Sequence, residues 1–131
     1  MDKRILVIDD DRAVCATMKH ILNRKGIKVY TAFSGSEALA IAAKQRFDLV
    51  ITDLVMPEQD GVIVISKFKT LFPAIPVIAM SGGARLGTPE TLASARQAGA
   101  DGLLRKPFTV ESLTAAVDAV VAGKARPILR G

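Results

Sequence analysis

The sequence has almost no cysteine, few aromatic residues and no long apolar run. Its 131 residues include one cysteine, one tyrosine, five phenylalanines and no tryptophan. A single cysteine excludes an internal disulfide and is typical of a reducing compartment. No apolar stretch reaches the roughly 18 residues of a membrane helix, and the N-terminus shows no signal-peptide pattern. We therefore expect a cytoplasmic protein that forms one domain with its own core.

Basic residues outnumber acidic ones by 18 to 13, which gives a formal net charge of +5. An excess of positive charge raises the question of nucleic-acid binding. The lysines and arginines are scattered, however, with no basic run and almost no aromatic residues between them. Solvated helix faces explain this pattern better than a nucleic-acid site does. A basic surface can equally dock an acidic protein partner.

Five short apolar runs alternate with helix-like segments. These runs are rich in β-branched residues, as strands that are covered on both faces should be. The predicted strands are Arg4–Ile8, Lys28–Ala32, Leu49–Thr52, Pro76–Met80 and Gly102–Leu104. Strict alternation predicts an α/β fold, in which a doubly wound five-stranded parallel sheet carries five helices on its two faces.

Capping and stop signals place the five helices. The first is predicted from Arg12 to about Lys25, with Asp11 as its N-cap and Gly26 as its stop. The other four are predicted to begin at Ser34, where Glu37 completes a capping box, after Asp60-Gly61 with an end near Leu71, at Thr88-Pro89, and at Thr109. Residues 123–131 contain one proline and two glycines. We expect them to form a flexible tail after a domain that spans residues 1–122.

Carboxylates and one lysine stand at the ends of the predicted strands. Five residues have this placement: Asp9, Asp10, Asp53, Ser81 and Lys106. Ligand sites of open parallel sheets form at the carboxyl edge, where the strand order reverses, so we expect these side chains to meet there. Crowded carboxylates repel one another unless a cation neutralises them, and Mg²⁺ prefers a few carboxylates, water and a phosphate oxygen. The set therefore predicts a Mg²⁺ site beside a carboxylate that can accept a phosphoryl group.

Six short motifs follow one another in a particular order and spacing. They are Val7-Ile8-Asp9-Asp10-Asp11, Ile51-Thr52-Asp53-Leu54-Val55-Met56-Pro57, Asp60-Gly61, Ala79-Met80-Ser81-Gly82, Ala98-Gly99-Ala100 and Lys106-Pro107-Phe108. Together they resemble the receiver domain of bacterial two-component response regulators, over about residues 2–122. The resemblance implies a flavodoxin-like sheet with strand order 2-1-3-4-5.

The resemblance also implies a phosphoacceptor and a metal site. Asp53 would take a phosphoryl group from a histidine kinase or a histidine phosphotransfer protein. Asp10 and Asp53 would bind Mg²⁺ through their side chains, Val55 through its carbonyl, and Asp9 mainly through water. Lys106 would hold a phosphoryl oxygen, and the peptide bond that follows it would be cis.

A second implication concerns switching. In the family, phosphorylation shifts the face formed by the fourth helix, the fifth strand and the fifth helix, which binds a downstream protein or a second copy of the domain. Ser81 would hold a phosphoryl oxygen and take part in the switch. Leu103 stands three residues before Lys106, where the family has an aromatic residue, and it offers no hydroxyl. We expect the glycine-rich segment 82–87 to take over part of the switching.

Two rival functions use the same residues. An aspartate-nucleophile phosphatase has a nucleophile and a second carboxylate two residues apart after its first strand, as Asp9 and Asp11 are. The chain lacks that class's cap insertion and its late acidic pair, however. A receiver-like module that signals without phosphate would not need the complete set of acidic residues. Since a receiver consumes its own side chain once per cycle, we interpret the chain as a stand-alone signalling module, not as an enzyme.

Overall fold

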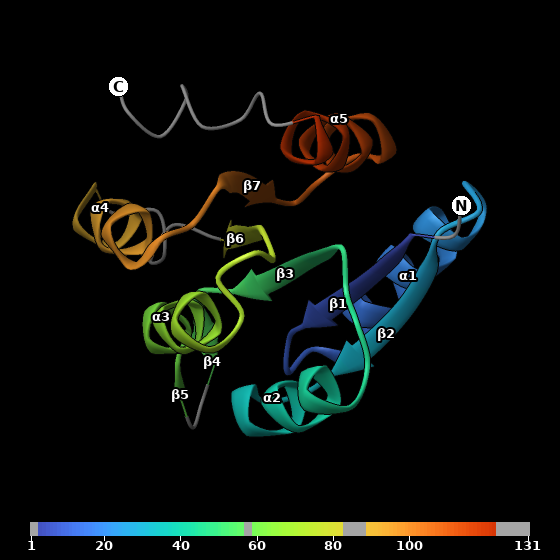
Figure 1. The fold of residues 1–131 in the computed structure, drawn as a ribbon. Helices are drawn as coiled ribbons and strands as arrows, with labels where there is room; N and C mark the ends of the chain where they lie inside the picture. Colours follow the sequence, from blue (N-terminus) through green and yellow to red (C-terminus); the bar gives the residue numbers. More distant parts are fainter. Residues whose placement is uncertain (1–2, 57–58, 83–88, 123–131) are drawn as a thin grey trace.

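The computed structural model describes residues 3–56, 59–82 and 89–122, and in this part five long strands alternate with five helices (Figure 1). The long strands are β1 (Arg4–Ile8), β2 (Lys28–Ala32), β3 (Leu49–Asp53), β6 (Val77–Gly82) and β7 (Gly102–Lys106). The helices are α1 (Arg12–Asn23), α2 (Gly35–Lys44), α3 (Gly61–Leu71), α4 (Pro89–Ala98) and α5 (Val110–Val121). Two short strands, β4 (Val55–Met56) and β5 (Gln59–Asp60), form a separate antiparallel pair.

The five long strands form one parallel sheet in the order β2-β1-β3-β6-β7. Counted along these five strands alone, this is the order 2-1-3-4-5, so the predicted flavodoxin-like sheet is confirmed. From β1 the chain passes to β2 at the edge of the sheet and then crosses back to β3. The switch point of the strand order therefore lies between the paired strands β1 and β3. Helices α1 and α5 cover one face of the sheet, and α2, α3 and α4 cover the other (Figure 1).

Alternate residues of each strand belong to two separate hydrophobic clusters, one on each face of the sheet. In β1, Ile5 and Val7 pack with α1 and α5, whereas Leu6 and Ile8 pack with α2 and α3. All four are at most 1% exposed. Burial on both faces explains why the strands are nearly continuous apolar runs instead of alternating ones. Each such side chain contributes on the order of 2 kcal/mol of transfer free energy, which anchors the strand ends that carry the site.

Helix α1 begins as predicted but ends earlier. Asp11 caps it by accepting hydrogen bonds from the backbone N–H groups of Ala13 and Val14. The helix ends at Asn23 and not at Lys25, because the N–H groups of Lys25 and Gly26 donate to carbonyls only three residues back, at Leu22 and Asn23. Gly26, with φ of +82°, then reverses the chain.

The capping box expected at α2 has a different partner. Ser34 accepts from the backbone N–H of Glu37, as predicted, but the Glu37 carboxylate accepts from the N–H of Phe33. A full reciprocal capping box is found instead at the N-terminus of α5, where the side chains of Thr109 and Ser112 each accept a hydrogen bond from the other's backbone N–H. The hydroxyl of Ser112 performs the task that a glutamate or glutamine usually performs.

Three strands differ from the prediction at their ends. β3 includes Asp53, β6 runs from Val77 to Gly82, and β7 continues through Lys106. Each polar end residue has a partner in the neighbouring strand, since Asp53 pairs with Met80 and Gly82 pairs with Lys106. Asp53, Ser81 and Lys106 therefore lie within the last residues of their strands, whereas Asp9 and Asp10 follow the end of β1.

Asp101 follows the motif Ala98-Gly99-Ala100, where the sequence alone predicts a turn residue, but the structure buries it. It is 7% exposed, and its Oδ2 accepts from the N–H of Val77 at 2.9 Å and from Lys69 Nζ at 3.0 Å. Three expectations fall outside the described residues: the Thr88 cap, the glycines beyond Gly82 and the tail 123–131. Within the described ranges, none of the helices combines the length and the apolar character that a bilayer span requires.

Candidate functional site

The carboxyl edge of the sheet brings three acidic side chains together. One carboxylate oxygen each from Asp9, Asp10 and Asp53 lies within 4.8 Å of the other two. Asp9 and Asp53 are buried, whereas Asp10 is exposed to solvent. These residues end or follow β1 and β3, which pair with each other at the switch point of the sheet.

The backbone around Asp9 is held from several sides. Its N–H donates to the carbonyl of Ala32 at 3.1 Å, which ties it to the end of β2. Its Oδ1 accepts from the N–H of Asp11 at 2.9 Å, and its carbonyl accepts from the thiol of Cys15 at 3.3 Å. Burial, followed by the negative charge of Asp9, raises the pKa of Cys15 to about 12. The thiol is therefore a packed donor and not a nucleophile.

Lys106 is the cation of the site. Its Nζ donates to Asp9 Oδ2 at 2.6 Å and lies 3.4 Å from Asp53 Oδ2. Burial alone would lower the pKa of Lys106, but the hydrogen bond to Asp9 and the charges of Asp53 and Asp9 outweigh it, so the pKa is raised. The ammonium stays charged and balances part of the acidic cluster. The Lys106–Pro107 peptide bond is cis, as the resemblance implied.

Asp53 is the most perturbed carboxylate. It is 4% exposed, and its pKa is raised to about 6, first by burial and then by the charge of Asp9, against the opposing pull of Lys106. Its Oδ2 faces the lysine ammonium, whereas the buried Oδ1 has no hydrogen-bond partner among the described residues. Buried oxygens without a partner are rare in folded proteins and often mark a site that receives a ligand.

The donor set fits a hard divalent cation. Three formal negative charges, on Asp9, Asp10 and Asp53, face the one positive charge of Lys106. Mg²⁺ takes oxygen ligands and keeps several waters, so an exposed carboxylate and the unpaired Asp53 oxygen suit it. The group can thus hold a metal ion. Val55 lies in β4, two residues past Asp53, and a role for its carbonyl stays a prediction.

Two predicted switch residues lie on the strands next to this cluster. Ser81 is buried, pairs with Arg105, and follows Met80, the partner of Asp53. Leu103 is half-buried in β7 and packs with the apolar cluster under α2, α3 and α4. Leu103 therefore fills the core on the side of the sheet that α4 covers.

Two glycines contribute close contacts that sequence reasoning did not predict. A Cβ at Gly61 would lie 2.5 Å from Leu54 Cα and would overlap the carbonyl oxygen of Asp53. A Cβ at Gly82 would lie 2.9 Å from Lys106 Cδ. The absent side chains let α3 pack against the turn after Asp53 and let the lysine cross the end of β6. The only signal in the sequence was the presence of a glycine in each of the two motifs, Asp60-Gly61 and Ala79-Met80-Ser81-Gly82.

A parallel sheet of this order with an acidic carboxyl edge defines a receiver-type signalling domain. The chain belongs to this family, because the family model of the response regulator receiver domain matches residues 5–118.

Known relatives agree with this assignment. The transcriptional regulatory protein PrrA of Mycobacterium tuberculosis is 38% identical over 118 residues, which cover 90% of this chain and 49% of that protein. ZraR of Escherichia coli is 37% identical over 118 residues, 90% of this chain and 26% of that protein. The chain thus spans half or less of these curated relatives.

Solved structures show the same fold. The chemotaxis protein CheY4 of Vibrio cholerae superposes with a TM-score of 0.85 at 30% identity, over 92% of this chain and 99% of that one. A CheY-like receiver domain protein of Methanospirillum hungatei gives a TM-score of 0.87 at 28% identity, over 97% of this chain and 99% of that one. Both of these structures are matched over nearly their full length.

Proposed function

We propose that Asp53 accepts a phosphoryl group from a histidine kinase or a histidine phosphotransfer protein, and that this reaction depends on Mg²⁺. The observation that carries the proposal is the buried Asp53 carboxylate, with one oxygen unpaired and the other facing Lys106. Its neighbours, Asp9 and Asp10, supply the remaining carboxylates of a cation site. A nucleophile, a metal site and a fixed ammonium are the parts that phosphoryl transfer to a carboxylate requires.

In the proposed step the phosphoryl group passes directly from a phosphohistidine to Asp53. An oxygen of Asp53 attacks the phosphorus of a phosphohistidine, and the new P–O bond forms as the P–N bond breaks. The imidazole leaves with the electron pair of that bond and takes up a proton. A bound Mg²⁺, held by Asp10, Asp53 and the Val55 carbonyl with Asp9 acting through water, would supply charge neutralisation for the phosphoryl oxygens.

Lys106 and Ser81 are proposed to stabilise the product. The Lys106 ammonium already lies within 4 Å of both buried carboxylates, so a small rotation can bring it to a phosphoryl oxygen. Ser81 lies in β6 one residue past Met80, the partner of Asp53, and can offer its hydroxyl to a phosphoryl oxygen on Asp53.

The output is proposed to be a change of partner binding at the face formed by α4, β7 and α5. Ser81 and Leu103 connect the site to this face, since β6 and β7 pair from Ile78–Gly102 to Gly82–Lys106. We propose a signalling module that modifies only its own side chain, and a homodimer through the same face stays a prediction. The relatives PrrA and ZraR are transcriptional regulators longer than this chain, so an attached or separate output partner fits equally well.

Acetyl phosphate tests the central claim. We expect intact-mass spectrometry to find one added phosphoryl group on the wild-type protein with Mg²⁺, and none after EDTA treatment or in Asp53→Asn. Asp118→Asn, which removes the same charge from an exposed position of α5, is the matched control and should be labelled normally. Labelling of Asp53→Asn would overturn the assignment. Beryllofluoride bound at Asp9 and not at Asp53 would favour the phosphatase alternative.

A further inference from the structure

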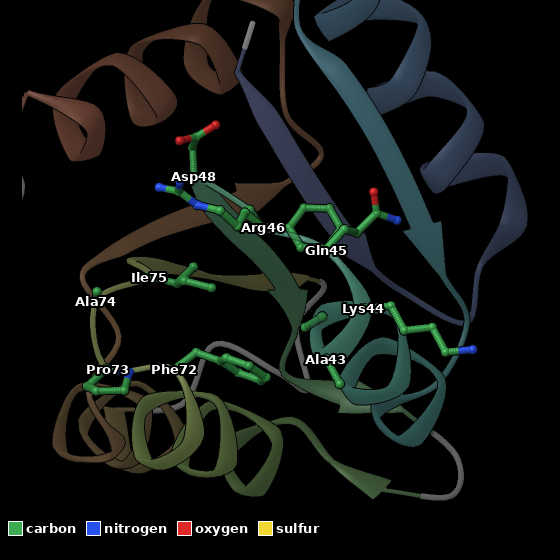
Figure 2. Close-up of a pocket in the computed structure, with 11 residues that line it drawn as sticks. Ala43, Lys44, Gln45, Arg46, Asp48, Phe72, Pro73, Ala74 and Ile75 are labelled. Atoms are coloured by element: carbon green, nitrogen blue, oxygen red, sulfur yellow. The ribbon is translucent and has the colours of Figure 1, made fainter.

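A pocket of about 600 Å³ lies at the edge of the sheet opposite to Asp53 (Figure 2). The segment between α2 and β3 and the segment between α3 and β6 form its walls. Because the strands are parallel, the starts of β3 and β6 lie at the amino edge, far from the acidic cluster at the carboxyl edge. The volume falls within the range of ligand sites, which is roughly 300–1,000 Å³.

Two phenylalanines and one isoleucine give the pocket an apolar interior. Phe47 is buried, and its ring meets Tyr30 edge-on with centroids 5.5 Å apart. Phe72 is half-buried, and its ring lies against Phe68 at 5.7 Å. In Figure 2, Phe72 and Ile75 lie on one side of the space and Ala43 on the other. Both phenylalanine rings of the wall thus pack against a neighbouring ring, and an apolar wall of this kind suits a flat aromatic ligand.

The rim of the pocket is basic. Lys44 and Arg46 are exposed lining residues, and the one acidic lining residue is Asp48. Asp48 already binds β1, since its Oδ2 accepts from the N–H of Arg4 at 2.8 Å and its own N–H donates to the Arg4 carbonyl. Lys28 continues the basic edge, because it pairs with Arg4 in the sheet. The rim therefore favours an anionic group over a cationic one.

We propose that this pocket binds a small aromatic anion, a one- or two-ring body that carries a carboxylate or a sulfonate. The ring would lie between Phe72 and Ala43, and Arg46 would bind the anion. A guanidinium suits a carboxylate because it offers a planar pair of donors, which an ammonium does not. Figure 2 shows Lys44 extending away from Phe72 and Ile75, so Lys44 would contribute only a general positive potential to anion binding. The site is independent of phosphorylation at Asp53.

The test uses 2-naphthoate as the probe and the ¹⁵N-labelled wild-type chain. We expect saturable amide shifts confined to residues 42–48 and 72–75, with an affinity of about 1 mM or tighter. The matched uncharged probe, 2-naphthalenemethanol, should bind about tenfold more weakly, since the charge-assisted contact is absent. Shifts that scatter over the surface or do not saturate would overturn the site. Equal binding of the two probes would overturn the anionic specificity.

Two pairs of variants sharpen the result. Arg46→Gln and Lys44→Gln remove the same charge, and only the first should lower the affinity for 2-naphthoate by about tenfold. Ala43→Trp should fill the pocket and abolish the shifts, whereas Ala93→Trp, at an exposed position of α4, should leave them unchanged. Undiminished binding by either Arg46→Gln or Ala43→Trp counts against the proposed placement. If a tryptophan variant folds poorly, the amide shifts of the wild-type chain with 2-naphthoate still test the proposal.

Discussion

Lys106 Nζ lies 3.4 Å from Asp53 Oδ2, although β6 separates the strands that carry the two residues. The lysine crosses this intervening strand at Gly82, where a Cβ would lie 2.9 Å from Lys106 Cδ and 3.0 Å from Lys106 Cβ. The contact between ammonium and carboxylate therefore depends on a residue that takes no part in it. Gly82 is a positioning residue for the proposed chemistry.

Enlarging Gly82 should weaken the site through Lys106. Gly82→Ala crowds the lysine stem by a few tenths of an ångström, and Gly82→Val crowds it more. We expect the affinity for beryllofluoride with Mg²⁺, measured by NMR titration, to fall several-fold in the first variant and about tenfold or more in the second.

A double-mutant cycle distinguishes an effect of Gly82 through the position of Lys106 from a general loss of structure. If Gly82 acts by placing the lysine, Gly82→Val should cost little further affinity in a Lys106→Ala background. Independent, additive losses in the two variants would contradict the positioning role. Circular dichroism of each variant checks that the fold is retained.

The metal-free protein should lose stability as pH rises through the titration of Asp53. The pKa of this carboxyl is raised from 3.8 to about 6 in the folded state, first by burial. Protonated Asp53 therefore favours the folded state, an effect that is complete below pH 3.8 and lost as pH rises through about 6. Asp53→Asn removes this titration, so its unfolding free energy relative to wild type should rise by about 2 kcal/mol between pH 4 and pH 7.5.

Urea unfolding in EDTA at several pH values measures this difference. The comparison across pH cancels any constant effect of the amide at a buried position. Asp118→Asn is the control, because it removes a carboxylate at an exposed position of α5 and should show no such trend. A flat difference between wild type and Asp53→Asn from pH 4 to 7.5 would falsify the raised pKa.

Gly61→Ala should destabilise the turn that follows Asp53. The added methyl group would lie 2.5 Å from Leu54 Cα and 2.7 Å from its carbonyl carbon, and backbone atoms cannot rotate away as a side chain can. We expect a loss of about 1–3 kcal/mol in unfolding free energy, together with slower labelling by acetyl phosphate.

Gly26→Ala provides the contrast. Gly26 has a φ of +82°, and an added methyl group would meet nothing within 4 Å, so alanine there is strained only by its backbone. The variant should lose about 1 kcal/mol and still accept phosphate at the wild-type rate. Equal labelling rates in Gly61→Ala and Gly26→Ala would remove the proposed link between α3 and Asp53.

The parallel sheet and its acidic edge were predictable because they depend on local patterns and general rules of topology, whereas the strand order came from the resemblance to receiver domains. Apolar runs predicted the long strands, and a parallel sheet brings strand ends such as Asp9 and Asp53 to one edge. Asp10 and Lys106 followed from the same reasoning, and the helix cap at Asp11 followed from its capping signal. Each of these residues stands at the end of a strand or at the start of a helix, so its place in the sequence predicts where it lies in the fold.

The features that were missed depend on contacts between distant segments. Asp101 reads as a surface residue in sequence, but the partners that bury it, Lys69 and Val77, belong to α3 and β6. The short pair of β4 and β5 has two residues in each strand, too few for any periodic signal. The close contact at Gly82 exists only because β6 and β7 pair in one particular register. Patterns within one segment carry no information about such contacts.

Lys69 and Asp101 should behave as a partly buried ion pair that links α3 to the start of β7. Their side chains are 20% and 10% exposed, and Lys69 Nζ also donates to the carbonyl of Ile75. Asp101→Ala removes the acceptor of the Val77 N–H and also removes the carboxylate that pairs with the Lys69 ammonium. We therefore expect a loss of about 3–5 kcal/mol in unfolding free energy. Lys69→Met keeps an apolar stem against Gly99 and should cost less, about 1–3 kcal/mol.

The double variant decides whether the two residues act as a pair. Because Lys69 Nζ and Asp101 Oδ2 contact each other directly, the combined loss should be smaller than the sum of the single losses by about 1 kcal/mol or more, measured by urea unfolding. The ion pair lies at the amino edge of the sheet, whereas Asp53 ends β3 at the carboxyl edge. Folded samples of all three variants should therefore be labelled by acetyl phosphate at the wild-type rate. Additive losses, or labelling that falls with stability, would contradict a purely structural pair.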